Sequence, residues 1–196
     1  MLEEAKHLEY ERQSLERERL VLKEERERWE KSHEDSRIPQ GAFWEVVWPK
    51  WECRAYGKRE YWGILRNIPQ DRNDLDACMN MPVEVKGVAI KRPDRCLYEE
   101  GSSYVHGFWM VDWDQPDCKP WHKYLMDKGC TNPGSGIRRI EAELAGINRK
   151  GQQDWYVLCE TTPMTWDHIT YSSPTHRDER DDGKKIAMWD IPDSRC

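Results

Sequence analysis

The most regular hydrophobic pattern in the chain lies in its first 37 residues, where apolar residues recur every seven positions. The series consists of Leu8, Leu15, Leu22 and Trp29. A seven-residue apolar spacing is typical of one seam of a coiled coil. The segment contains neither Gly nor Pro, and Pro39 and Gly41 then stop a helix. The pattern predicts a long charged helix over residues 1–37.

The second half of that seam is mostly basic. The residues three positions before each member of the series are Ala5, Arg12, Arg19 and Arg26. A two-stranded coiled coil would therefore pack arginine stems beside its leucines. Glutamates three or four residues before Lys or Arg also stabilise a single helix in water. A weak dimerising coiled coil and a solvated single helix both stay open, and we favour self-association because four apolar residues in register are unusual in so polar a segment.

After Phe43 the pattern changes to tryptophans, prolines and short alternating strands, and it occurs twice. The spacing Cys-x3-Pro-x10-Pro is followed each time by a Trp and a final Cys. The matched positions are Cys78, Pro82, Pro93, Trp109 and Cys118 in the first copy and Cys159, Pro163, Pro174, Trp189 and Cys196 in the second. We interpret this self-similarity as a duplication. It predicts repeat units at 52–118 and 130–196, a connector at 119–129, and a linker at 38–51 with a Trp-rich docking segment.

Each unit shows the same order of elements. In the second unit an alternating strand at 138–144 is followed by a polar turn, a short helix at 155–161, a second strand at 167–172 and a third at 185–191. The short loops require mainly antiparallel pairing. Units of about 65 residues are marginal alone. We therefore predict an α+β fold, in which a long N-terminal helix precedes two β-rich repeat units that share a core.

The tandem units resemble uncharacterised tandem-repeat Cys/Trp proteins of mushroom-forming fungi, through the doubled Cys-x3-Pro-x10-Pro spacing and the terminal Trp, Asp and Cys. The resemblance covers residues 52–196, and its motifs are loose. It implies no activity and no functional residues.

Composition restricts the classes of partner. The net charge of −6 and a pI near 5.6 provide no basic surface, which argues against nucleic acid. No window approaches the roughly 20 apolar residues of a membrane helix, and residues 1–37 contain no secretion-like apolar run. We expect a soluble, intracellular protein, in either cytoplasm or nucleus. The 11 tryptophans predict a core built on aromatic side chains.

The 7 cysteines are an odd number and include no Cys-x-x-Cys pair. Because disulfides rarely persist inside cells, we expect buried free thiols, with secretion and bridges as the alternative. If bridges exist, the duplication permits Cys78–Cys118 and Cys159–Cys196. Cys96 has no counterpart, since Arg177 stands in its place.

Two groups of residues are candidates for chemistry. Exposed tryptophans would bind a sugar or a peptide, or else dock the helix onto the fold; the candidates are Trp44, Trp48, Trp113 and Trp121. Asp112, Asp114 and Asp117 would hold a hard cation or share acid and base roles, unless they form a polar turn. The histidines show no zinc-binding spacing.

These observations favour a non-enzymatic protein-interaction module that needs no cofactor. It would self-associate through helix 1–37 as a homo-oligomer and bind a protein or peptide partner. The alternatives are a carbohydrate-binding, lectin-like domain that uses exposed tryptophans and a metal-assisted hydrolase that uses the Asp cluster.

Overall fold

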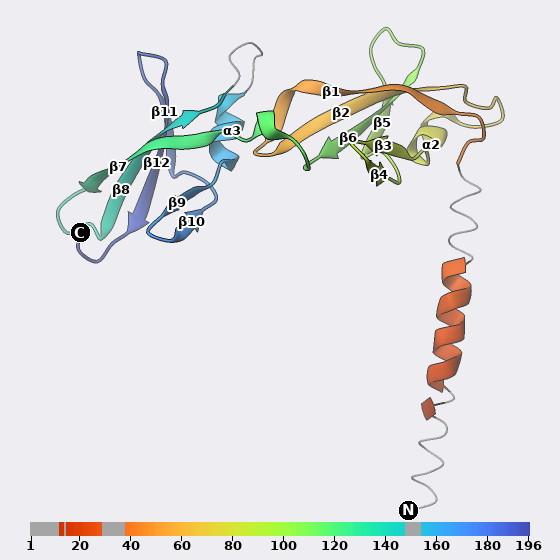
Figure 1. Ribbon diagram of the computed structural model, residues 1–196, viewed down its shortest axis with the longest axis horizontal. Coiled ribbons are helices and arrows are strands. Elements are labelled where there is room, and N and C mark those ends of the chain that lie inside the picture. Colours follow the sequence, from red (N-terminus) through yellow and green to blue (C-terminus); the bar gives the residue numbers. More distant parts are fainter. Residues whose placement is uncertain (1–11, 14, 29–37, 148–153) are drawn as a thin grey trace, which may run out of the picture. The chain divides into compact units, whose positions relative to one another are not determined.

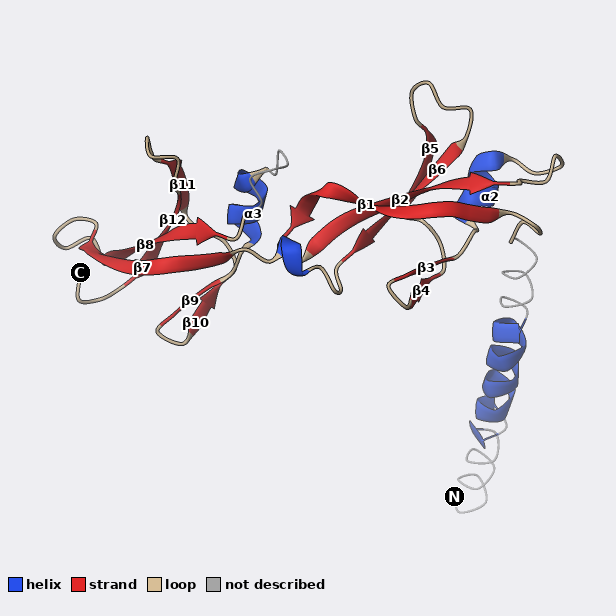
Figure 2. Cartoon of the chain, turned by 45° about the horizontal axis from the view of Figure 1, so that its top comes forward, coloured by secondary structure: helices blue, strands red, loops and turns tan. Residues whose placement is uncertain are grey.

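The computed structural model describes residues 12–13, 15–28, 38–147 and 154–196 (Figure 1). Within this part of the chain, strands predominate and helices are short (Figure 2). The strands form small antiparallel sheets. The predicted α+β class is therefore wrong, and the fold is mostly β. The short loops that favoured antiparallel pairing also leave little chain for helices between the strands.

The amino-terminal helix is described over residues 15–28 and is short, which corrects the prediction of a long helix; apart from residues 12–13, the rest of the predicted range 1–37 lies outside the described residues. Leu8 and Trp29, the outer members of the seven-residue series, lie outside the described residues. Every described residue of the helix is exposed. Because most helical stability in proteins comes from packing, this segment has chiefly its own side-chain pairs to hold it.

The first module consists of the elements β1 to β6. Its four-stranded sheet has the order β1-β2-β6-β5. These strands are β1 (Phe43–Ala55), β2 (Lys58–Arg66), β5 (Arg95–Tyr98) and β6 (Val105–Val111). Between β2 and β5 lie the helix α2 (Asp74–Met79) and a hairpin of β3 (Val83–Val85) and β4 (Val88–Ile90). A 3-10 turn at Pro116–Cys118 follows β6.

The second module, β7 to β12, has the same order of elements. Its sheet has the order β7-β8-β12-β11, which repeats that of the first sheet. These strands are β7 (Trp121–Cys130), β8 (Ile137–Ala145), β11 (His176–Glu179) and β12 (Lys185–Pro192). The helix α3 (Trp155–Thr161) and a hairpin of β9 (Met164–Trp166) and β10 (Ile169–Tyr171) again separate the inner and outer strands.

Both helices begin at side-chain caps. The carboxamide oxygen of Asn73 accepts hydrogen bonds from the backbone of α2, and a carboxylate oxygen of Asp154 does the same for α3. These caps satisfy amide groups that the first helical turn leaves without partners. The short helix predicted at 155–161 is confirmed.

The strand predicted at 167–172 consists of the turn and the second strand of a hairpin that begins at Met164, and the corresponding segment of the first unit, 83–90, is a complete two-stranded hairpin. Lys86 and Gly87 have φ values of 50° and 78°, and Asp167 and His168 have values of 48° and 64°. Two successive residues of positive φ are characteristic of the two-residue turns that join adjacent antiparallel strands. Such a turn reverses the chain within what the apolar pattern suggested was one strand.

Strands also occupy segments that the sequence analysis assigned to connections. β1 covers most of the predicted linker at 38–51, and β7 covers most of the predicted connector at 119–129. By compactness the chain divides differently again, into one unit of 1–44 and 65–105 and another of 45–64 and 106–196. The repeat boundaries 52–118 and 130–196 stay a prediction.

Buried residues form more than one cluster, and the core shared by the two repeat units stays a prediction. One cluster, within the first compact unit, contains Leu65, Ala77, Cys78 and Val105. Another, within the second unit, is centred on Ile140, Leu158 and Trp189. Trp109 and Trp189, the matched tryptophans of the duplication, are each 1% exposed, as the prediction of core positions requires.

Three disulfides overturn the expectation of free thiols. They join Cys53 to Cys118, Cys78 to Cys96 and Cys130 to Cys196, while Cys159 is free and buried. The predicted pairs Cys78–Cys118 and Cys159–Cys196 are therefore wrong. The cause is that Cys53 and Cys130 lie on β1 and β7, and most of each strand was left out of the predicted repeats.

Candidate interaction surfaces

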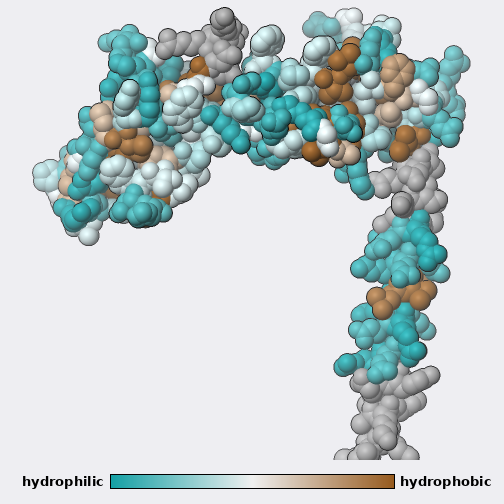
Figure 3. Space-filling model, in the orientation of Figure 1, coloured by the Kyte–Doolittle hydropathy of each residue, from teal (hydrophilic) through white to brown (hydrophobic). Residues whose placement is uncertain are grey.

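The amino-terminal helix carries apolar side chains that the described part of the chain does not cover. Leu15 is 61% exposed and Leu22 is 64% exposed, and they lie one heptad apart. Leu20 and Val21 are exposed to a similar degree beside them, and hydrophobic residues are grouped among hydrophilic ones on this helix (Figure 3). An exposed leucine repeat on a polar helix is the arrangement that a second helix covers in a coiled coil.

The same helix also carries ion pairs between its own side chains. Lys23 lies 3.9 Å from Glu27, and Arg28 lies 3.8 Å from Glu24, each pair one helical turn apart. Exposed pairs of this kind contribute only a few tenths of a kcal/mol each. They do not remove the leucine side chains from water.

A second exposed surface lies on β1, the first strand of its sheet. We use the name β1 surface for three exposed apolar side chains of this strand, Val46, Trp48 and Trp51. Trp51 is 81% exposed and Trp48 is 55% exposed. Because indole rings lose apolar surface to water when they are covered, two exposed rings on one edge strand are a candidate contact surface for a ligand. Trp51 is not among the ligand-binding residues predicted from the sequence.

The predicted ligand-binding tryptophans differ in their exposure. Trp44 is half-buried, its indole Nε1 donates a hydrogen bond of 2.9 Å to the carbonyl oxygen of Pro82, and it packs on the cluster around Leu65. Trp113 is also half-buried. Trp44 therefore packs within the fold rather than offering a free ring.

Trp121 and Trp48 are exposed, but they lie in different sheets. Trp121 begins β7 and is 58% exposed. One of its faces covers Gly146, where an added Cβ would overlap the indole ring. The glycine is thus what allows the tryptophan to lie flat on the chain at this point.

The aspartates predicted as a metal site receive no support from the geometry. Asp112, Asp114 and Asp117 are all exposed, and Asp117 lies 3.8 Å from a guanidinium nitrogen of Arg59. Across the residues that the structure describes, no group of three or more His, Cys, Asp or Glu side chains is placed to hold a metal ion. Asp114 has a φ of 46°, which fits the polar turn considered as the alternative.

The second module contains an ion-pair network that the sequence analysis missed. Arg138 Nε donates to Asp193 at 2.6 Å, and a second nitrogen of Arg138 donates to Asp127 at 2.6 Å. Arg195 also donates to Asp193 at 2.9 Å. These donors lower the pKa of the Asp193 carboxyl well below its usual range. The network links β7, β8 and the end of the chain, beside the Cys130–Cys196 bridge.

A neighbouring pair crosses from β8 to β12. Arg139 donates two hydrogen bonds of 2.7 Å to the two carboxylate oxygens of Asp190, and the two residues are directly paired in the register of the strands. His176 Nε2 lies 3.3 Å from the same carboxylate. Hydrogen bonds from Arg139 lower the pKa of Asp190. Register pairs like this are visible in sequence only once the strand alignment is known.

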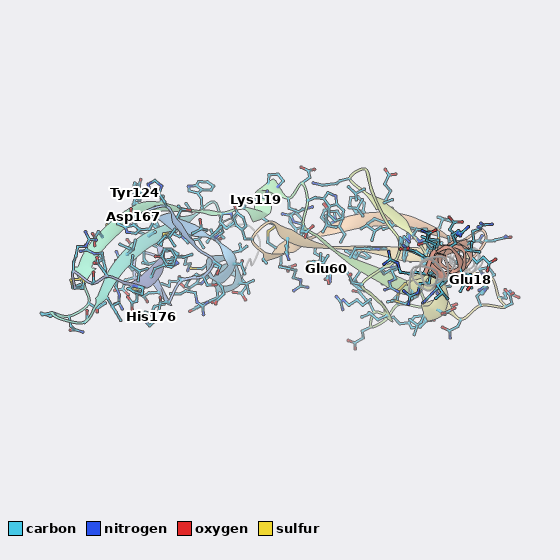
Figure 4. The ribbon with its side chains drawn as sticks, turned by 90° about the horizontal axis from the view of Figure 1, so that it is seen from below. Glu18, Glu60, Lys119, Tyr124, Asp167 and His176 are labelled. Carbon is cyan, nitrogen blue, oxygen red and sulfur yellow. A yellow bond between two sulfur atoms is a disulfide. The ribbon has the colours of Figure 1, made fainter. Side chains whose placement is uncertain are left out.

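Glu60 is a buried carboxylate in the first module. Glu60 is labelled in Figure 4, and its Oε2 lies 3.1 Å from Arg54 and 3.3 Å from Lys50, both from β1. A buried carboxylate needs such partners because its desolvation is costly. The pairing joins β1 to β2 and so supports the strand that carries the β1 surface.

His122 is held in its neutral form. Its Nε2 lies 3.1 Å from the carbonyl oxygen of Thr162, and its ring packs edge-on against Trp189 at 4.7 Å between centroids. Burial lowers the pKa of His122 despite the hydrogen bond to Thr162. These contacts place His122 in the packing of the second module.

Comparison of the chain with protein families, curated proteins and solved structures found no match. The resemblance to fungal tandem-repeat proteins therefore stays a prediction. No helix among the described residues is both long and apolar enough to cross a membrane.

Proposed function

We propose that the protein is a non-enzymatic interaction module that self-associates through its amino-terminal helix and presents two disulfide-bridged β modules to a protein or peptide partner. The observation that supports this most is the exposure of Leu15 and Leu22, one heptad apart on a helix whose described residues are all exposed. Full burial of a leucine side chain contributes about 1.5–3 kcal/mol. Two leucines per helix thus supply a driving force for a weak dimer.

Sedimentation velocity of the full chain over a range of concentrations tests this proposal. The variant Leu15→Ser with Leu22→Ser should weaken the dimer by about tenfold or more. The matched control is Leu20→Ser with Val21→Ser, because these residues are 58% and 55% exposed but lie off the seven-residue seam. The control should sediment like the unmodified chain. A monomeric unmodified chain at every concentration would show that the helix is a solvated single helix.

A second candidate function is carbohydrate binding at the β1 surface. The exposure of Trp48 and Trp51 on one edge strand favours it, since flat indole faces stack well on sugar rings. A glycan array probed with the full chain, and then with Trp48→Ala and Trp51→Ala, tests this function. Tyr156→Ala is the matched control, because Tyr156 is an exposed aromatic residue on α3. Binding that survives both tryptophan changes, or no binding at all, refutes it.

We also propose that the chain works in an oxidising compartment, in place of the intracellular location expected from sequence. Three disulfides support this, because reducing compartments keep most thiols free. The protein, recovered from its natural source with its thiols blocked at the moment of lysis, should show one alkylated cysteine per chain, Cys159. Seven alkylated cysteines would place it in a reducing compartment.

A further inference from the structure

We propose that the amino-terminal helix pairs with the same helix of a second copy in a parallel, in-register dimer. In this dimer Glu18 and Glu25 of each helix bind Arg19 and Arg26 of the other. The inference rests on the proposed self-association and specifies its partner, direction and register. It also explains the arginines that a leucine seam would otherwise exclude.

The heptad places three residue types in fixed positions. Leucine occupies position d (Leu15, Leu22), arginine occupies position a (Arg19, Arg26) and glutamate occupies position g (Glu18, Glu25). Positions a and d form the seam of a coiled coil, and position g borders it. Each arginine is therefore preceded directly by a glutamate at the border of the seam.

A parallel dimer converts this spacing into ion pairs between helices. Each residue at position a inserts into a hole of the facing helix, and one wall of that hole is the g residue just before the facing a residue. Arg19 therefore faces Glu18 of the partner subunit, and Arg26 faces Glu25 of the partner subunit. Charge-assisted hydrogen bonds between guanidinium and carboxylate are stronger than neutral ones. The arginine stems meanwhile cover the leucines between them.

One of the conventional pairs across a parallel seam is also complementary. Position g of one heptad reaches position e of the next heptad on the facing helix. Here Glu18 would reach Lys23 of the partner subunit, which adds attraction in the same direction. Glu18 is labelled on the helix, seen nearly along its axis, in Figure 4.

An antiparallel dimer would lose these contacts. In that arrangement g positions face g positions, so that Glu18 and Glu25 would approach the glutamates of the facing helix. Like charges across an interface disfavour the arrangement that brings them together. The arginines at position a and the glutamates at position g of the described helix therefore favour the parallel direction, although Glu16 and Lys23 at position e would attract each other in the antiparallel one.

Cysteine cross-linking of the full chain tests direction and register together. In a parallel, in-register dimer the two copies of position 22 lie side by side in the seam, so Leu22→Cys should form an intermolecular disulfide in a glutathione redox buffer. Leu20→Cys is the matched control, because Leu20 is similarly exposed but lies off the seam. Leu22→Cys should cross-link about tenfold faster than the control. Equal rates in a chain that does dimerise would overturn the inference.

Charge reversal supplies an independent test. Glu18→Arg with Glu25→Arg, and Arg19→Glu with Arg26→Glu, should each weaken homodimers by about tenfold or more because they juxtapose like charges. An equimolar mixture of the two variants should recover dimers by restoring opposite charges. A dimer that forms without this complementation would refute the parallel pairing but leave self-association standing. A monomeric unmodified chain would refute the proposed self-association itself.

Discussion

The positive charge of the Arg177 guanidinium partly offsets the rise in the pKa of the buried Cys159 thiol. At the corresponding positions of the first module, a disulfide joins Cys96 to Cys78. Cys78 and Cys159 occupy the same position within α2 and α3, and Cys96 and Arg177 are each the second residue of β5 and β11. The second module thus carries a thiol and a cation at the positions where the first module carries a bridge.

A cysteine at position 177 should form a disulfide with Cys159, as Cys96 does with Cys78 in the first module. We predict that Arg177→Cys forms a disulfide with Cys159 and raises the free energy of unfolding by about 3 kcal/mol, because the new bridge closes a loop like the one between Cys78 and Cys96. That loop has a sequence separation of 18. Thiol titration in denaturant should then find no free thiol, where the unmodified chain has one. Arg177→Ala separates the loss of the cation from the gain of the bridge, and two free thiols in Arg177→Cys would contradict the prediction.

The thiol of Cys159 should react slowly in the folded protein. Burial raises its pKa to about 11 from 9.0, and the nearby Arg177 offsets only part of this. At pH 8 only about one thiol in a thousand is then ionised, so alkylation by iodoacetamide should be slow until the pH approaches 11. Rapid alkylation of the folded chain at pH 8 would show that the thiol is exposed or activated.

Because folding raises the pKa of Cys159, the free energy of unfolding should decrease at alkaline pH. A pKa that is raised on folding favours the protonated form, so the stabilisation is complete below pH 9 and is lost as the pH rises toward 11. In urea unfolding measured across this window, Cys159→Ala should show a smaller loss of stability than the unmodified chain. Equal slopes would mean that Cys159 does not contribute.

The ionisation of Asp193 should contribute to how the free energy of unfolding changes at acid pH. Hydrogen bonds from Arg195 and Arg138 lower the pKa of its carboxyl on folding. The ionised form therefore stabilises the fold above the unfolded value of 3.8, and this stabilisation is lost as the pH falls below it. We predict that Asp193→Asn is less stable at pH 7 and loses less stability between pH 5 and pH 2, by urea unfolding at each pH.

Asp182→Asn is the control for this prediction. The pKa of Asp182 is also lowered, chiefly by its hydrogen bond with Lys184, but both side chains are about half exposed and lie in one turn. An exposed pair contributes little, so the control should unfold like the unmodified chain at pH 7. A control as destabilised as Asp193→Asn would remove the distinction between the network and a surface pair.

Gly146→Ala should destabilise the protein by about 3 kcal/mol. Its φ is 79°, and the added methyl group would overlap the ring of Trp121. Gly183→Ala isolates the backbone contribution, because Gly183 has a φ of 78° and nothing within 4 Å of an added Cβ. That control should lose only about 1 kcal/mol in urea unfolding.

Trp121→Ala provides the second half of a double-mutant cycle with Gly146→Ala. The cost of the alanine should fall toward that of Gly183→Ala when the indole ring is absent. Additive costs would show that the ring does not occupy the space above Gly146.

The sequence predicted local elements better than the fold class. α3 begins and ends where its apolar residues, its Asp154 cap and the following proline indicate. The hairpin turns at 86–87 and 167–168 were missed because Lys-Gly and Asp-His at positive φ are weaker turn signals than Asn-Gly. The predicted helix extended beyond the described residues 15–28, because charge pairing favours a helix without fixing its length.

Contacts between residues far apart in the sequence were harder to predict. The disulfide pairing depends on β1 and β7 bringing Cys53 and Cys130 to Cys118 and Cys196, which spacing alone does not show. Exposure was equally hidden: Trp44 and Trp48 lie four residues apart, yet one packs on the core and the other remains in water. The residues that pack over each position, rather than residue type, decide which tryptophan is exposed: Pro82 and the cluster around Leu65 contact Trp44.

The bridges Cys53–Cys118 and Cys130–Cys196 keep the fragments joined when the chain is cut inside either ring. Each encloses almost a whole module, with sequence separations of 65 and 66. A single proteolytic cut inside either ring leaves its two fragments covalently attached until a reductant opens the bridge. A cut between Cys118 and Cys130 falls outside both rings and breaks the covalent connection between the modules.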